Sequence, residues 1–238
     1  RSRAPGAPCG ASMRDVARQF PDDLDAATLF AESGMNLHPW GLWHQDGTPE
    51  AGTEEVVATL ESVMKRDPNH LGAIHYYIHA VEASNNPERA LAGANRLAAL
   101  APNAGHIVHM PAHIYIRTGD YEAAVKTNEQ AAQVDRTYIK ETGVQGIYPM
   151  MYYSHNLHFV AMCGAMNGRY TDARKNGDLL IANVGPHVKD MPPLEAKAFP
   201  TDDERAAAIA WIRNSLSAYE AAHGGEPGPV TVRRLTSA

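Results

Sequence analysis

The sequence predicts an all-α protein in which pairs of antiparallel helices repeat along the chain, followed by a C-terminal helix. Alanine-rich segments with apolar residues at helical spacing dominate the 238 residues, and segments that alternate like β-strands are nearly absent. A shift of the sequence by 34 positions aligns Pro68 with Pro102 and one pair of histidines with another. A period of this length fits two helices and their turns, so we expect a helical repeat array.

Composition and charge limit the classes of function. Hydrophobic residues make up 44% of the chain and charged residues 20%, as in globular proteins. A formal net charge of −6 argues against a broad basic surface for nucleic acid. No apolar run approaches the roughly 20 residues of a membrane span. Because the chain opens with Arg1 and shows no secretory segment, we expect a processed or truncated product whose compartment stays open.

The first predicted helices are marked by apolar residues three or four positions apart and by residues that end helices. Residues 54–65 form an amphipathic helix that stops at Pro68. Residues 71–83 form the next helix, which breaks before Pro87, and residues 88–100 form its antiparallel partner.

Later segments repeat this arrangement. A turn at residues 118–120 precedes a helix over residues 121–134. We expect residues 135–148 to form an inserted loop, and residues 149–183 to form another helix pair with its turn at Gly168. The chain then divides into three segments. Residues 1–36 form an N-terminal helical or irregular segment, residues 37–184 form the repeat segment, and residues 185–238 form a Pro-rich connector with a final helix and tail.

Seven of the twelve histidines recur in phase with the repeat. They lie in the segments HYYIH, HIVHMPAH and HNLH and are His75, His79, His106, His109, His113, His155 and His158. A shift of 34 brings the first pair onto His109 and His113, and a shift of 49 brings His106 onto His155. Equivalent residues of stacked repeats face the same way, so we expect these imidazoles to converge.

Converging imidazoles predict a transition-metal site. Imidazoles from neighbouring helices can meet around one ion, because packed helices lie about 8–10 Å apart. Crowded imidazolium groups would repel one another, and an ion that binds the neutral rings removes the repulsion. Glu82, one turn after His79, is the candidate catalytic residue, and it could serve as a ligand, an orienting group or a proton acceptor.

Copper is the favoured metal and zinc the second choice. Imidazole suits both ions, whereas one acidic candidate is too few for magnesium or calcium. Soft sulfur atoms nearby in the sequence favour copper, although methionine is also a common core residue: Met110, Met150, Met151, Met162 and Cys163. Two copper ions with about three histidines each would form an oxygen-using oxidoreductase site. Zinc on the same ligands would instead activate water for hydrolysis.

The repeat resembles the tetratricopeptide family. The resemblance rests on the 34-residue period, on small residues such as Ala90 and Ala124 in second helices, and on the prolines that close each unit. It covers roughly residues 40–183, and Trp40, Trp43 and residues 54–68 resemble a degenerate leading repeat. The segments HYYIHAVEAS, HMPAHIY and YPMMYYSHNLHF also resemble an uncharacterised group of bacterial repeat proteins.

The resemblance implies an α-solenoid in which the first helices of successive repeats line a concave groove. Positions 2, 5 and 9 of these helices face the groove, and all seven histidines take such positions. A small molecule or a peptide would then bind in the groove of a soluble protein from the bacterial cytoplasm or periplasm, with the oligomeric state left open. Many tetratricopeptide proteins are non-catalytic adaptors, but they usually line the groove with Lys, Arg and Asn.

Proline inside the HIVHMPAH segment is a difficulty for this reading. Pro111 removes a backbone hydrogen bond, so the helix either starts or kinks there. If it starts there, His106 and His109 lie on the preceding loop. The remaining histidines are expected to be ordinary surface or hydrogen-bonded residues: His38, His44, His70, His187 and His223.

Overall fold

A computed structural model describes residues 7–185 of the chain. Within this range the regular structure is helical, apart from one isolated bridge between Trp43 and Pro49, which confirms the predicted all-α class. The predicted connector, final helix and tail lie outside the described residues, as do His187 and His223. A search of the described helices finds none long and apolar enough to span a bilayer.

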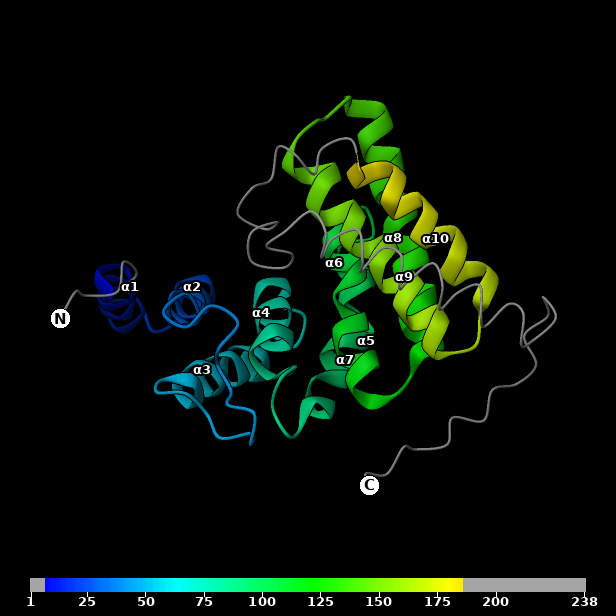
Figure 1. Ribbon diagram of the computed structural model, residues 1–238. Coiled ribbons are helices and arrows are strands. Elements are labelled where there is room, and N and C mark those ends of the chain that lie inside the picture. Colours follow the sequence, from blue (N-terminus) through cyan, green and yellow to red (C-terminus); the bar gives the residue numbers. More distant parts are fainter. Residues whose placement is uncertain (1–6, 186–238) are drawn as a thin grey trace, which may run out of the picture. The chain divides into compact units, whose positions relative to one another are not determined.

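The chain forms two compact units, which divide between Val134 and Asp135. Figure 1 labels the helices α1 to α10 along the chain. The described elements of the first unit are α1 (Ala7–Gln19), α2 (Leu24–Met35), α3 (Thr53–Arg66), α4 (Leu71–Val81), the 3₁₀ turn η1 (Pro87–Ala90), α5 (Leu91–Leu100), α6 (Gly105–His109) and α7 (Pro111–Thr118). Helix α8 (Tyr121–Thr142) belongs in part to each unit. The second unit continues with the π-helix η2 (Tyr148–Tyr153), α9 (Ser154–Met166) and α10 (Tyr170–Val184).

Local chemistry sets the ends of the helices around the site. The Nδ1 atom of His70 accepts a hydrogen bond of 3.1 Å from the Ala73 backbone N–H, which caps the start of α4. Gly119 ends α7 in a left-handed conformation with a φ of 82°, at the predicted turn. The predicted helix over residues 88–100 begins instead as the 3₁₀ turn η1, with Pro87 at its start.

The core of the first unit is formed by aliphatic side chains of α3, α4, α5 and α7. Leu60, Ile74, Ile78, Leu97 and Ile114 are fully buried and belong to one cluster. Because this core holds α4 against α7, the histidine-bearing helices have a rigid base.

The loop between α2 and α3 carries both tryptophans that the tetratricopeptide resemblance placed in a leading repeat. Trp40 and Trp43 lie in this loop and not in a helix, and α2 packs against α3 in place of the expected first helix. The Nε1 of Trp43 donates a 2.7 Å hydrogen bond to the carbonyl of Ala80. The loop is therefore fastened to α4, close to the histidines.

The prediction of an inserted loop over residues 135–148 was wrong for most of its length, because α8 continues to Thr142. Asp135 lies on this extension with no exposed surface, and its carboxylate accepts hydrogen bonds from the Tyr148 hydroxyl at 2.7 Å and the Asn156 amide at 2.6 Å. Burial raises the pKa of Asp135 despite these bonds. The contact to η2 and α9 joins segments distant in sequence, so helical periodicity alone did not indicate it.

Two glycines of the second unit give a direct test of how α9 meets α10. A methyl group on Gly164 would lie 3.3 Å from the backbone nitrogen of Ala173 and 3.4 Å from the carbonyl oxygen of Arg169, whereas one on Gly177 would meet no atom within 4 Å. We expect Gly177→Ala to raise the free energy of unfolding by about 0.5–1 kcal/mol, because alanine loses less backbone entropy in a helix. Gly164→Ala should lower it, since backbone atoms cannot move aside. Urea denaturation of both variants checks this, and equal gains in stability would contradict the close approach of the two helices.

Candidate metal centre

Five of the seven predicted histidines lie in the first unit, on three helices. His75 and His79 are one turn apart on α4, His106 and His109 lie on α6, and His113 lies on α7. Residues three or four apart share one side of a helix, so each helix presents its imidazoles together. The structure thus brings these five together as the sequence predicted.

Pro111 causes a break between two helices without producing a loop. Helix α6 ends at His109 and α7 begins at Pro111, while Met110 between them keeps helical backbone angles, with φ −50° and ψ −38°. Proline is well placed at the first position of α7, where its missing N–H costs nothing. A helix does start at Pro111, as one of the two alternatives predicted. The loop expected before it was wrong, because His106 and His109 lie on the helical turn of α6.

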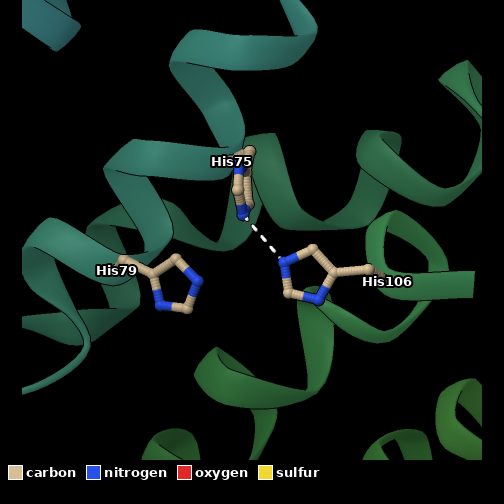
Figure 2. Close-up of side chains that lie close together, drawn as sticks. All are labelled: His75, His79 and His106. Atoms are coloured by element: carbon tan, nitrogen blue, oxygen red, sulfur yellow. Dashed lines mark hydrogen bonds between the residues drawn. The ribbon is translucent and has the colours of Figure 1, made fainter. Parts of the chain in front are cut away.

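The first cluster consists of His75, His79 and His106, whose rings converge in Figure 2. The Nε2 atoms of His75 and His106 are 3.1 Å apart. One nitrogen from each of the three rings lies within 4.8 Å of the others, so the group could hold a metal ion. The ring centroids of His79 lie 5.2 Å and 6.3 Å from those of His75 and His106.

Glu82 fixes the orientation of two imidazoles from different helices. Its carboxylate oxygens lie 2.9 Å from Nδ1 of His79 and 2.6 Å from Nδ1 of His113. An ionised carboxylate can only accept hydrogen bonds, so both Nδ1 atoms donate. His79 consequently presents its Nε2 to the first cluster, which is how a carboxylate commonly orients a metal-binding histidine.

A second imidazole pair, His109 and His113, adjoins the first cluster. Their Nε2 atoms are 2.9 Å apart, and both residues are buried. The Nδ1 of His109 lies 2.6 Å from Oδ1 of Asn128, whose amide nitrogen donates to the carbonyl of Ala124 at 2.8 Å. Asn128 therefore accepts from His109, and two neutral rings would direct their Nε2 lone pairs at each other. A shared proton or a metal ion removes that repulsion.

Both nitrogen pairs have the spacing of neighbouring ligands on one ion. Two nitrogens about 2.0–2.1 Å from an ion, at angles of about 90–110°, lie about 2.9–3.4 Å apart. The pair of His75 and His106 at 3.1 Å and the pair of His109 and His113 at 2.9 Å both fall in this range. The donor set is imidazole nitrogen, which suits copper and zinc.

The electrostatics of the cluster favour a neutral His75 and an ionised Glu82. Burial and, to a smaller extent, the charges of neighbouring imidazoles together lower the pKa of His75 to about 3; these neighbours are His79, His106 and His113. Burial raises the pKa of Glu82, but hydrogen bonds and positive charge from His113 and His79 outweigh it and hold the value at about 2. Neutral His75 is the form that a metal ion requires.

A cavity of about 440 Å³ opens beside the imidazoles. His79, Glu82 and His113 form part of its lining, and Trp40 and Tyr76 contribute aromatic surface. The volume falls in the range of small-molecule sites. Ions bound at the cluster would therefore be reachable by a substrate.

Two of the predicted ligands lie on α9, and two of the predicted sulfur-bearing residues are buried. His155 and His158 belong to the second unit, where their rings lie 4.7 Å and 6.5 Å from the ring of Phe159. Met110 is fully buried in the aliphatic core, which is the core role that the sequence also allowed. Cys163 is buried in the second unit, and burial raises the pKa of its thiol to about 11.

Sequence reasoning missed two residues of the site. Asn128 carries no sequence signal, because its contact with His109 depends on how α8 packs. Trp40 was predicted to belong to a degenerate leading repeat, whereas it lies in a loop and lines the cavity. Among the histidines treated as ordinary, His44 forms a surface ion pair with Glu50, and His70 caps α4.

Comparisons with known proteins identify no relative. The chain matches no protein-family model and no curated protein.

Replacing Glu82 by glutamine tests its role in the metal-free protein. A carboxylate with a depressed pKa stabilises the fold above its ordinary value near 4.5, and that contribution disappears as the pH falls toward about 2. We expect Glu82→Gln to be less stable than the unmodified protein at pH 5, by about 3 kcal/mol at most, with the difference shrinking as the pH falls. Urea unfolding between about pH 5 and 2 measures it. The matched variant Glu141→Gln, at the exposed end of α8, should show no such trend. A difference for Glu82→Gln that is constant with pH would refute the assignment.

Proposed function

We propose that the first unit binds a transition-metal ion through Nε2 of His75, His79 and His106, and that the loaded protein is a metal-dependent enzyme acting on a small molecule. The observation that carries this proposal is the convergence of three imidazole nitrogens within 4.8 Å, one of them oriented by Glu82. The neighbouring cavity supports a catalytic role, because it gives a substrate access to the same imidazoles.

An oxygen-dependent oxidoreductase with copper is the function that we place first. The second pair, His109 and His113, supports a centre with two ions, since the ring of His113 lies only 5.1 Å from that of His79. With a catechol as reductant, two substrate molecules would each lose two electrons and two protons, and one dioxygen would become two waters. The protein's contribution is to orient the imidazoles through Glu82 and Asn128 and to hold the substrate beside them.

A zinc-dependent hydrolase on the same ligands is the second candidate. Its support is the three-imidazole arrangement itself, because catalytic zinc is commonly held by three protein ligands with one position left for water. The third candidate is a peptide-binding adaptor without catalysis.

We also infer that the helix pairs stack as in tetratricopeptide repeats. Helices α4 and α7 contact each other and carry histidines at positions related by the 34-residue shift, which supports this arrangement.

Metal content tests the ligand assignment. The purified protein should carry near-stoichiometric copper or zinc, and the double variant His79→Ala/His113→Ala should lose it. His75→Ala should also lower occupancy, and it leaves both hydrogen bonds of Glu82 in place, so it guards against a folding defect. The surface variant His44→Ala is the matched control and should keep its metal. Elemental analysis gives the metal-to-protein ratio, and full occupancy in His75→Ala would exclude that residue as a ligand.

Glu82→Gln and Asn128→Leu test the orienting groups. Loss of a group that orients a metal ligand commonly lowers metal affinity about 10–100-fold, so both variants should bind more weakly without losing the site. Competition with a chelator of known affinity measures the change. Unaltered affinity in both variants would show that these hydrogen bonds do not orient the ligands.

Reconstitution distinguishes the candidate functions. Copper added to the metal-free protein should produce oxygen consumption with catechol, and zinc should produce none. If zinc alone restores turnover of ester substrates without oxygen, the hydrolase is the correct candidate. If the metal-loaded protein shows neither reaction, both enzyme proposals fail, and the peptide-binding adaptor becomes the favoured candidate.

A further inference from the structure

Trp40 is the least expected residue in the first unit. Its side chain is 91% exposed, although it is one of the largest apolar groups in the chain. It is also the one non-glycine residue with a positive φ, 63°, among residues 7–185. Bulky residues rarely adopt this conformation, and where they do, the surrounding structure often holds them for a function.

The backbone around Trp40 is a turn that would suit glycine. The N–H of Gly41 donates to the carbonyl of His38 at 2.9 Å, so His38, Pro39, Trp40 and Gly41 form a four-residue turn. Proline suits the second position, and a positive φ at the third position normally selects glycine or asparagine. Tryptophan at that place gains little from burial, so folding alone does not account for it.

Trp40 lines the cavity and lies next to the imidazole of His79. Its indole ring lies edge-on to the imidazole of His79, with 6.2 Å between centroids and 87° between planes. Trp43 and Tyr76 line the same cavity of about 440 Å³, and the ring of Tyr76 lies 4.8 Å from that of His75. Three aromatic side chains therefore surround a space that ends at imidazoles.

We propose that this cavity binds a small planar phenol or catechol, with Trp40 as the aromatic surface that holds its ring. Aromatic rings pack favourably on one another at offset or edge-on geometries, which gives the walls their selectivity for a planar ligand. His79, Glu82 and His113 are among the polar residues that line the cavity, and they match a ligand with a hydroxyl group at one end. The other polar lining residues are Glu32, Asn36, His38 and Arg117. This proposal rests on the proposed function and names its substrate class.

The affinity of the full-length protein for catechol, measured by titration calorimetry, tests the proposal. Catechol should bind more tightly than cis-1,2-cyclohexanediol, which carries the same hydroxyl groups without an aromatic ring. Trp40→Gly should weaken catechol binding at least tenfold, while the melting temperature stays equal or rises, because glycine relieves the positive φ. Trp40→Ala should weaken binding similarly. Phe20→Ala removes another exposed aromatic residue that does not line the cavity, so it is the matched control and should bind normally.

Equal catechol affinity in Trp40→Gly and the unmodified protein would overturn the proposal, as would a failure to prefer catechol over the saturated diol. A lower melting temperature in Trp40→Gly would also overturn it, since Trp40 would then have a structural role. Metal content, determined on the same samples, separates this proposal from the proposed function. Catechol binding without any bound metal would refute the metal enzyme and leave the aromatic site standing.

Discussion

The bridge formed by Glu82 between two helices is the constraint on which the rest of the site depends. Glu82 ends α4, where its backbone N–H donates to the carbonyl of Ile78. Its carboxylate accepts hydrogen bonds from His79 on the same helix and from His113 on α7. The bridge fixes the position of α7 against α4, and it also fixes which nitrogen each ring presents. If this carboxylate were absent, the imidazoles could rotate, and convergence of their Nε2 atoms would cost conformational entropy on binding.

Packing five imidazoles close to one another carries an energetic cost that the fold must offset. Burial and neighbouring rings oppose protonation of His75, and the opposed Nε2 atoms of His109 and His113 repel when both rings are neutral. A stable structural network would normally alternate donors with acceptors. Here the acceptors Glu82 and Asn128 take the Nδ1 hydrogens and leave nitrogen facing nitrogen, which is the arrangement that a cation stabilises.

The loop that follows α2 gives the same region a second unusual feature. Trp43 is anchored to α4 through Ala80, whereas Trp40 is exposed and strained in the same loop. The loop is thus attached to α4 at Trp43 and exposes the aromatic ring of Trp40, which lies next to His79. Strain of this kind is commonly retained at binding sites, where positions are selected for the ligand and not for stability.

The sequence by itself determined the helices and the phase of the histidines. Local periodicity and helix-ending residues located α3, α4 and α10, and the 34-residue shift placed His75 and His79 in register with His109 and His113, because these features depend only on residues close in sequence. Tertiary structure decided that His75 of α4 meets His106 of α6. It also decided that α8 continues through Asp135, that Asn128 orients His109 and that Trp40 lines the cavity. Each of these depends on contacts between segments distant in sequence, which periodicity cannot encode.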